Sequence, residues 1–162
     1  MIPPFVSELR AQVGAASLML VGISSVILRS IKGSAPQILL VRPSGSDIWE
    51  PVNGIMEPLE QPAQTAVREA FEEAGVRIRV NTLAAVRTEQ EKTFPNGDRA
   101  VFLNILFRCE WLEGEPQPVD DEIAQAAWFE LHALPQVSPT TSSQIIMACE
   151  VTTGAWFENP SS

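Results

Sequence analysis

Residues 54–76 read GIMEPLEQPAQTAVREAFEEAGV, and they place Glu69, Glu72 and Glu73 within one turn of a predicted helix that follows a loop containing Glu60. Since an α-helix turns by about 100° per residue, steps of three and four residues return to nearly the same side. The three carboxylates therefore share one helix face, where like charges repel each other unless a cation lies among them. Carboxylate oxygens suit Mg²⁺, Mn²⁺ and Ca²⁺, so the pattern predicts a site for a divalent metal ion.

The helix that carries these glutamates has a predictable start, end and buried face. Pro62 suits the first turn, because its missing N–H would have had no hydrogen-bond partner there. Gly75 is placed as the C-terminal stop. An apolar stripe is formed by Ala66, Val67, Ala70 and Phe71. We therefore expect one helix with a buried face and an acidic edge.

The same stretch resembles the signature box of the Nudix hydrolase (MutT-like) family. The pattern is Gly, five residues, Glu, seven residues, Arg-Glu, an apolar residue, one residue, Glu-Glu, one residue, Gly and an apolar residue. It is met by Gly54, Glu60, Arg68, Glu69, Ala70, Glu72, Glu73, Gly75 and Val76. The flanking segments LLVRP, TFPNGDR and AWFELHALP are similar to a bacterial subgroup of the family. The resemblance implies an α/β fold, an α/β/α sandwich around a mixed β-sheet.

The resemblance also implies an activity and a metal site. The expected protein is a Mg²⁺- or Mn²⁺-dependent hydrolase that cleaves the pyrophosphate link of a nucleoside diphosphate attached to another moiety. Nucleoside triphosphates, ADP-ribose and dinucleoside polyphosphates are all open as substrates. Glu69, Glu72 and Glu73 are the implied metal ligands, together with the backbone carbonyl of Gly54. The alternative is a Nudix-like domain that binds a nucleotide as a sensor without turnover.

Two further acids and one arginine complete the expected catalytic group. Arg68 is expected to hold the glutamates in place, and Glu60 is either an outer metal ligand or the partner of Arg68, which we favour. An ordinary i, i+4 pair between Arg68 and Glu72 is compatible with that role. In many family members an acid on the loop before the last strand supplies a general base or another metal ligand, and here we select Glu122 from the run Asp-Asp-Glu at 120–122.

Basic and aromatic side chains outside the box are candidates for substrate contact. The candidates are Arg42, Trp49, Arg87, Phe94 and Arg99, with Lys92 and Arg108 as further basic side chains. Trp49 and Phe94 would stack on a base. His132 is the only histidine. It has no partner histidine and no serine elbow motif, so the sequence does not support a nucleophilic triad.

The sequence departs from the usual box at two flanking positions. Where the family often has Gly-Gly, this chain has Asn53-Gly54, and where Gly often precedes the first box glutamate, it has Leu59. Asn tolerates positive φ better than other non-glycine residues, so the first change is expected to be mild. Leu59 is expected to affect the loop geometry more. Neither change removes a carboxylate.

The remaining segments mix strands and helices without the strict alternation of a doubly wound sheet. Helical spacing of Phe5, Leu9 and Val13 predicts a short amphipathic helix after the two N-terminal prolines. Apolar runs predict strands over residues 17–29, 37–42, 76–87, 100–111 and 123–129. Turns are predicted at 32–34 and 95–98. A last helix is expected over 140–149, capped by Thr140, Thr141 or Ser142.

Length and composition predict one domain over residues 1–157 and a disordered tail over 158–162. The chain has 162 residues, 45% of them apolar, which is enough for one sizeable core. Its net charge of -9 argues against a nucleic-acid partner and leaves a small nucleoside diphosphate derivative, bound through metal ions. Among family relatives homodimers are frequent, so a homodimer is a further expectation.

The same reading predicts a cytoplasmic protein that does not cross a membrane. The N-terminus lacks a cationic region followed by an apolar core, so no secretory signal is expected. The longest apolar stretch, residues 15–28, is interrupted by three serines and is shorter than the roughly 20 residues that span a bilayer. Cys109 and Cys149 lack metal-type spacing and are expected to be reduced, buried thiols.

Overall fold

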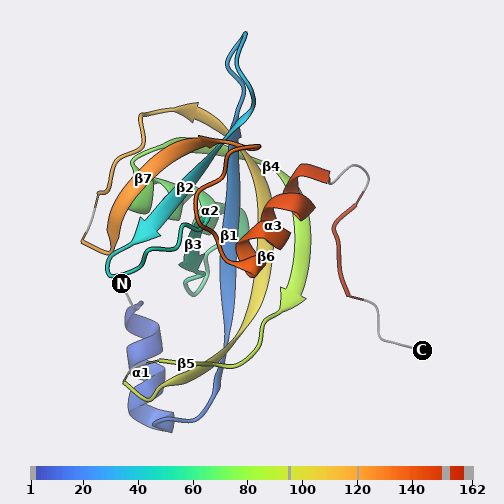
Figure 1. The fold of residues 1–162 in the computed structure, drawn as a ribbon. Coiled ribbons are helices and arrows are strands. Elements are labelled where there is room, and N and C mark those ends of the chain that lie inside the picture. Colours follow the sequence, from blue (N-terminus) through green and yellow to red (C-terminus); the bar gives the residue numbers. More distant parts are fainter. Residues whose placement is uncertain (1–2, 95, 120, 151–153, 159–162) are drawn as a thin grey trace.

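We describe a computed structural model of the chain, which covers residues 3–94, 96–119, 121–150 and 154–158. In these residues seven strands form one sheet (Figure 1). The strand order is β4 (Arg77–Thr88), β6 (Arg99–Glu113), β1 (Leu18–Arg29), β2 (Gln37–Pro43) and β7 (Ile123–Glu130). Two short strands lie off this path: β3 (Val52–Ile55) pairs with β1, and β5 (Lys92–Thr93) pairs with β6. Among the pairs of named strands in the described residues, β1 and β6 run parallel and the others antiparallel, so the sheet is mixed.

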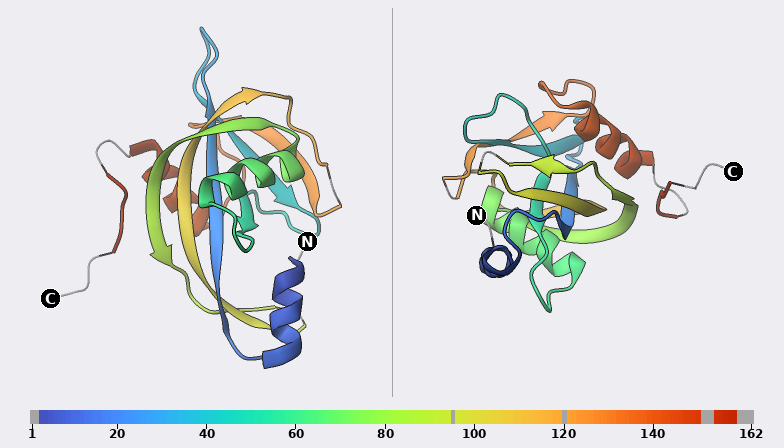
Figure 2. Two further views of the ribbon diagram at one scale, coloured as in Figure 1. Left: turned by 180° about the vertical axis from the view of Figure 1, so that it is seen from behind. Right: turned by 90° about the horizontal axis from the view of Figure 1, so that it is seen from below.

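Two helices cover the two faces of this sheet. Helix α2 (Pro62–Ala74) lies on one face and α3 (Pro139–Glu150) on the other (Figures 1 and 2). The alternation along β2 shows the division, because Leu39 and Val41 pack in the cluster that contains α2, whereas Ile38 and Leu40 pack in the cluster that contains α3. The predicted α/β/α sandwich with a mixed sheet is therefore confirmed.

Helix α1 (Pro4–Val13) lies apart from both layers, at one end of the molecule (Figure 2). Its Val6 packs in a small cluster with Leu20 of β1 and Ala100 of β6. The helix therefore closes the end of the long β1–β6 pair.

Most predicted elements are confirmed, with bounds that differ by a few residues. The sequence did not indicate β3 or β5, which are short. The predicted caps of α3 were wrong: the hydroxyl of Ser138 accepts the Thr141 N–H at 3.0 Å, so Ser138 caps the helix. At the predicted 95–98 turn, Pro95 lies outside the described residues, and the Gly97 N–H donates to the Phe94 carbonyl at 2.9 Å. None of the described helices is long and apolar enough to cross a membrane.

Candidate active site

The site is built where β3 passes beneath α2. β3 pairs with β1, so that Gly54 lies opposite Ile23. A Cβ built on Gly54 would lie 2.0 Å from the carboxyl carbon of Glu69 and 2.2 Å from its Cγ. Since no real side chain tolerates such distances, the carboxylate of Glu69 occupies the space that a side chain at position 54 would need. Gly54 and Glu69 therefore form a cradle that depends on glycine.

The guanidinium of Arg68 joins the acidic side chains of this region. It donates to both oxygens of Glu60, at 2.9 and 3.1 Å, in a bidentate pair. Its Nη1 donates to Glu69 at 2.8 Å and to Glu72 at 2.9 Å, and its Nη2 reaches the Ile55 carbonyl at 3.3 Å. The expected pairs of Arg68 with Glu60 and with Glu72 are both present. The arginine therefore links the loop before α2 to two of the predicted metal ligands.

The pKa values of two of these acids are displaced in opposite directions. Hydrogen bonds from Arg68 lower the pKa of Glu60 to about 2, against an opposing effect of burial. Burial raises the pKa of Glu69, although the neighbouring Arg68 opposes the rise. Of these two carboxylates, Glu69 is the one whose charge is less well compensated by the protein.

Glu73, the third predicted ligand, is held from the β3 side. Its carboxylate accepts the backbone N–H of Asn53 at 3.3 Å. The Asn53 side-chain oxygen accepts the Ser24 hydroxyl at 2.7 Å, and that hydroxyl in turn accepts hydrogen bonds from Asn104 and Gln144 at 2.9 and 3.2 Å. Asn53 is an ordinary strand residue without positive φ. Its amide therefore serves a buried polar network, and tolerance of positive φ has no part in its role.

A polar groove of about 920 Å³ opens beside the cradle. Gly54 and Asn53 lie in its wall, so the groove is continuous with the strand that contacts Glu69 and Glu73. Arg87 and Lys92 line it and can bind phosphate oxygens. The start of α3 contributes hydroxyl groups from Ser138, Thr140 and Thr141.

The structure brings only some of the predicted substrate contacts to this groove. Arg87 and Lys92 line it, but Arg42, Trp49, Phe94 and Arg99 do not. Arg42 donates to the Ser46 carbonyl at 2.6 Å, and Trp49 packs edge-on against Phe129 with ring centroids 4.7 Å apart.

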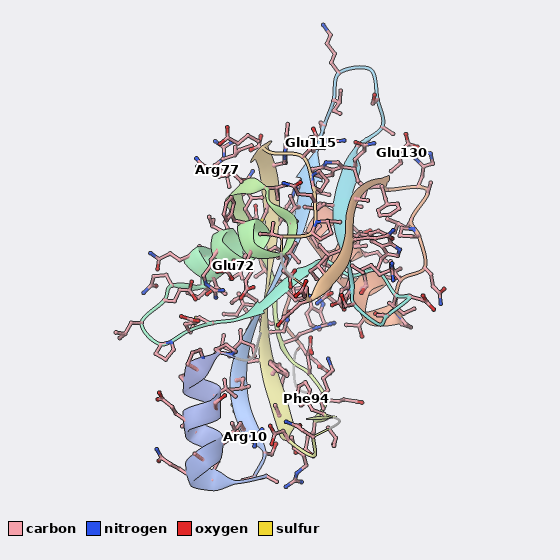
Figure 3. All side chains as sticks on the ribbon, turned by 90° about the vertical axis from the view of Figure 1, so that its left-hand side faces the viewer. Arg10, Glu72, Arg77, Phe94, Glu115 and Glu130 are labelled. Carbon is pink, nitrogen blue, oxygen red and sulfur yellow. The ribbon has the colours of Figure 1, made fainter. Side chains whose placement is uncertain are left out.

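The other candidates also have contacts outside the groove. Phe94 packs in the cluster beneath α1, at the same end of the molecule as Arg10 (Figure 3). Arg99 donates to the Ala15 carbonyl at 3.4 Å. Arg108 is not among the groove-lining residues. Neither is Glu122, whose backbone carbonyl accepts the Ser44 N–H at 2.7 Å.

Among the groove residues that the sequence analysis missed are Glu50 and Trp156. Glu50 reaches the groove because its backbone exchanges two hydrogen bonds with Val41 of β2, both of 2.9 Å. Burial raises the pKa of Glu50, and nearby Lys92 opposes the rise. No local sequence motif marks Glu50. For Trp156 the only signal in the sequence is an aromatic residue close to the C-terminus.

The residues of the cradle fit a hard divalent cation in their chemistry. Three carboxylates and a carbonyl are oxygen donors of the kind that Mg²⁺ and Mn²⁺ take. Within the described ranges, no three His, Cys, Asp or Glu side chains converge as a metal-binding group, and Arg68 holds Glu69 and Glu72. The Glu72 side chain is 51% exposed and lies at the outer edge of α2, where its carboxylate accepts the hydrogen bond from Arg68 (Figure 3).

Comparison with known proteins gives a consistent result. Residues 21–148 match the family model described as NUDIX domain. The NAD-capped RNA hydrolase NudC of Deinococcus radiodurans is 30% identical over 120 residues, which are 72% of this chain and 40% of that protein. The putative ADP-ribose pyrophosphatase YjhB of Bacillus subtilis is 31% identical over 113 residues, 68% of this chain and 53% of that protein. The chain thus spans about half or less of these relatives.

A solved structure resembles the chain over about four fifths of its length. The MutT NUDIX hydrolase from Burkholderia pseudomallei superposes with a TM-score of 0.63 at 26% identity. The match covers 81% of this chain and 98% of that one.

Proposed function

The chain belongs to the NUDIX domain family, and on this premise we propose that it is a metal-dependent pyrophosphohydrolase of nucleoside diphosphate derivatives. The observation that carries the proposal is the position of two of the predicted metal ligands beside the groove. Glu69 and Glu73 contact Gly54 and Asn53, and these two residues are in turn part of the groove wall. A phosphate bound in the groove would therefore lie beside the carboxylates.

We propose that Glu69, Glu72, Glu73 and the Gly54 carbonyl hold Mg²⁺ or Mn²⁺. When bound, such an ion neutralises phosphate charge and makes a bound water easier to deprotonate. Arg68 acts as a positioning residue, because it contacts two of the glutamates and the Ile55 carbonyl. Its loss should weaken the site without removing a ligand.

Side chains of the groove bind and orient the rest of the substrate. Arg87 and Lys92 suit the diphosphate, since they are the basic side chains that line the groove in the described residues. Glu122 is the base proposed from sequence. Glu50 is the second candidate, because it lines the groove and its raised pKa lets it take up a proton more readily than a solvated glutamate.

For the substrate we propose a dinucleotide-like molecule with a diphosphate between two nucleoside or sugar parts. The relatives are named for hydrolysis of NAD caps and, putatively, of ADP-ribose, and both molecules have this construction. The net charge of -9 favours a small molecule over a polynucleotide.

The test is a product screen over NAD⁺, ADP-ribose, a dinucleoside polyphosphate and a nucleoside triphosphate, each with Mg²⁺, with Mn²⁺ and with EDTA. We expect metal-dependent release of a nucleoside monophosphate from at least one compound, and a loss of at least about 10²-fold in Glu73→Gln. Glu50→Gln and Glu122→Gln, measured separately, identify the base by the larger fall in kcat. If a nucleotide binds in the presence of metal but is never hydrolysed, the proposal of an enzyme is wrong and the nucleotide-sensing domain takes its place.

We also propose that residues 1–157 form one domain, supported by the single sheet that α2 and α3 cover. Of the predicted tail, Glu158 lines the groove, and residues 159–162 lie outside the described residues. A homodimer and a cytoplasmic location stay predictions.

A further inference from the structure

The C-terminal residues 155–158, which we call the strap, lie against the edge of the sheet. The Trp156 N–H donates to the Ala84 carbonyl at 2.8 Å, and the Val86 N–H donates to the Trp156 carbonyl at 3.0 Å. These bonds form a parallel bridge between Trp156 and Ala85. Because β4 is the last strand of the sheet path, the strap covers an otherwise open edge (Figures 1 and 2).

The strap brings an aromatic side chain to the groove that also contains Gly54. Trp156 and Glu158 both line this groove. Trp156 also borders a second hollow, which is lined by Ile146 and Met147 of α3. Trp156 as a whole residue is 42% exposed, and its backbone is held by two hydrogen bonds. A large aromatic surface is thus offered to the groove on an ordered backbone.

The charges of the groove indicate what the strap can bind. Glu158 is the charged residue of the strap, whereas the basic side chains of the groove, Arg87 and Lys92, come from β4 and β5. A phosphate therefore gains more from these basic side chains than from the strap, whose carboxylate repels it and whose indole offers it little. A planar heterocycle without negative charge gains stacking energy on the indole and is not repelled.

We propose that Trp156 is a stacking surface for a heterocyclic ring of the substrate, so that the C-terminal strap helps to determine specificity. This inference rests on the proposed function for the identity of the substrate. The ring is either the adenine that NAD⁺ and ADP-ribose share or the nicotinamide that only NAD⁺ has. The two bonds to β4 fix the strap before the ligand arrives, which reduces the entropy lost on binding.

The experiment compares Trp156→Ala, Trp156→Phe and the control Phe157→Ala with the wild-type chain, using NAD⁺ and ADP-ribose with Mg²⁺. Phe157 is the neighbouring exposed aromatic residue of the strap and does not line the groove. In Trp156→Ala we expect KM to rise about 10-fold with kcat within about 2-fold, because a stacking contact is lost. Trp156→Phe should restore most of the affinity, and Phe157→Ala should match the wild type. If KM of Trp156→Ala rises for both substrates, the stacked ring is adenine. If KM rises for NAD⁺ alone, the stacked ring is nicotinamide.

The inference is overturned if Trp156→Ala hydrolyses both substrates with an unchanged KM, or if Phe157→Ala shows the same loss. It is also overturned if kcat and the melting temperature fall together with KM unchanged, since that would be a structural role. If the wild-type chain hydrolyses neither compound, calorimetric binding of both in Mg²⁺ replaces KM in the same comparison. Binding without turnover then contradicts only the proposed hydrolase activity. If the wild-type chain binds neither compound, both the proposed function and the stacking role of Trp156 are overturned.

Discussion

Glu60 and Glu69 accept hydrogen bonds from the same guanidinium, that of Arg68, and yet their pKa values are displaced in opposite directions. Glu60 receives two N–H groups from Arg68, and also accepts from Thr65 and from the Glu57 N–H. Glu69 receives one N–H and is more strongly affected by burial. Arg68 therefore outweighs the cost of burial for the charge of Glu60, whereas it offsets that cost only partly for Glu69.

Replacing Glu69 should raise the stability of the metal-free protein and remove its stabilisation by Mg²⁺. A raised pKa in the folded state means that stability is greatest below the unfolded pKa and falls as pH rises through the folded pKa. At pH 8 in EDTA, Glu69→Gln should therefore be more stable than the wild type, by about 1 kcal/mol or about 3 °C in Tm. Saturating Mg²⁺ should stabilise the wild type and have little effect on the variant. A variant that melts below the wild type in EDTA would contradict this reading.

Glu60 should show the opposite pH dependence. Its pKa falls from 4.5 to about 2 on folding, so its ionised form contributes stability above pH 4.5 that is lost as pH falls toward about 2. Glu60→Gln should cost about 2 kcal/mol at pH 7, because charged hydrogen bonds from Arg68 are lost. Urea unfolding at several pH values would measure this difference, which should shrink steadily between pH 5 and pH 2. A difference independent of pH would exclude the lowered pKa.

A methyl group at position 54 should displace the Glu69 carboxylate. In Gly54→Ala the new Cβ would stand 2.0 Å from that carboxyl group, which must rotate away and lose its bond to Arg68. Metal affinity should fall at least about 10-fold with a change in stability of about 1 kcal/mol, because the displaced atoms are the end of a flexible side chain. Calorimetric Mn²⁺ titration measures the affinity. Gly154→Ala is the matched control, since nothing lies within 4 Å of its Cβ position.

Leu59 should be a position where glycine stabilises the protein. Its φ is +70°, in the left-handed region, and its side chain is fully exposed. Leu59→Gly should relieve about 1–2 kcal/mol of backbone strain and lose about 0.5–1 kcal/mol through the freer unfolded chain, for a net gain of about 0.5–1 kcal/mol. Leu59→Ala keeps the strain and should leave Tm unchanged. Equal melting temperatures for the Gly and Ala variants would show that the loop is not strained.

Much of the fold could be predicted because its signals are local. Pro62 and Gly75 mark the two ends of α2, and Gly75 has the expected left-handed φ of 66°. The long strands were visible as runs of apolar residues, since β1 and β2 are covered on both faces. The acidic edge of α2 followed from helical periodicity alone. The pair of Arg68 with Glu72 could also be expected, because Glu72 lies one turn away on the same helix.

The groove could not be predicted, because it is assembled from segments far apart in the chain. Trp49 and Phe94 looked like stacking surfaces, but both pack against apolar neighbours. The groove instead received Glu50 and Trp156 through backbone pairing with β2 and β4. The sequence by itself determined the glutamate row and the helix that carries it, since both depend on spacing within about two turns. Only the tertiary structure decided which side chains face that row, because strand register over long separations determines where each side chain points.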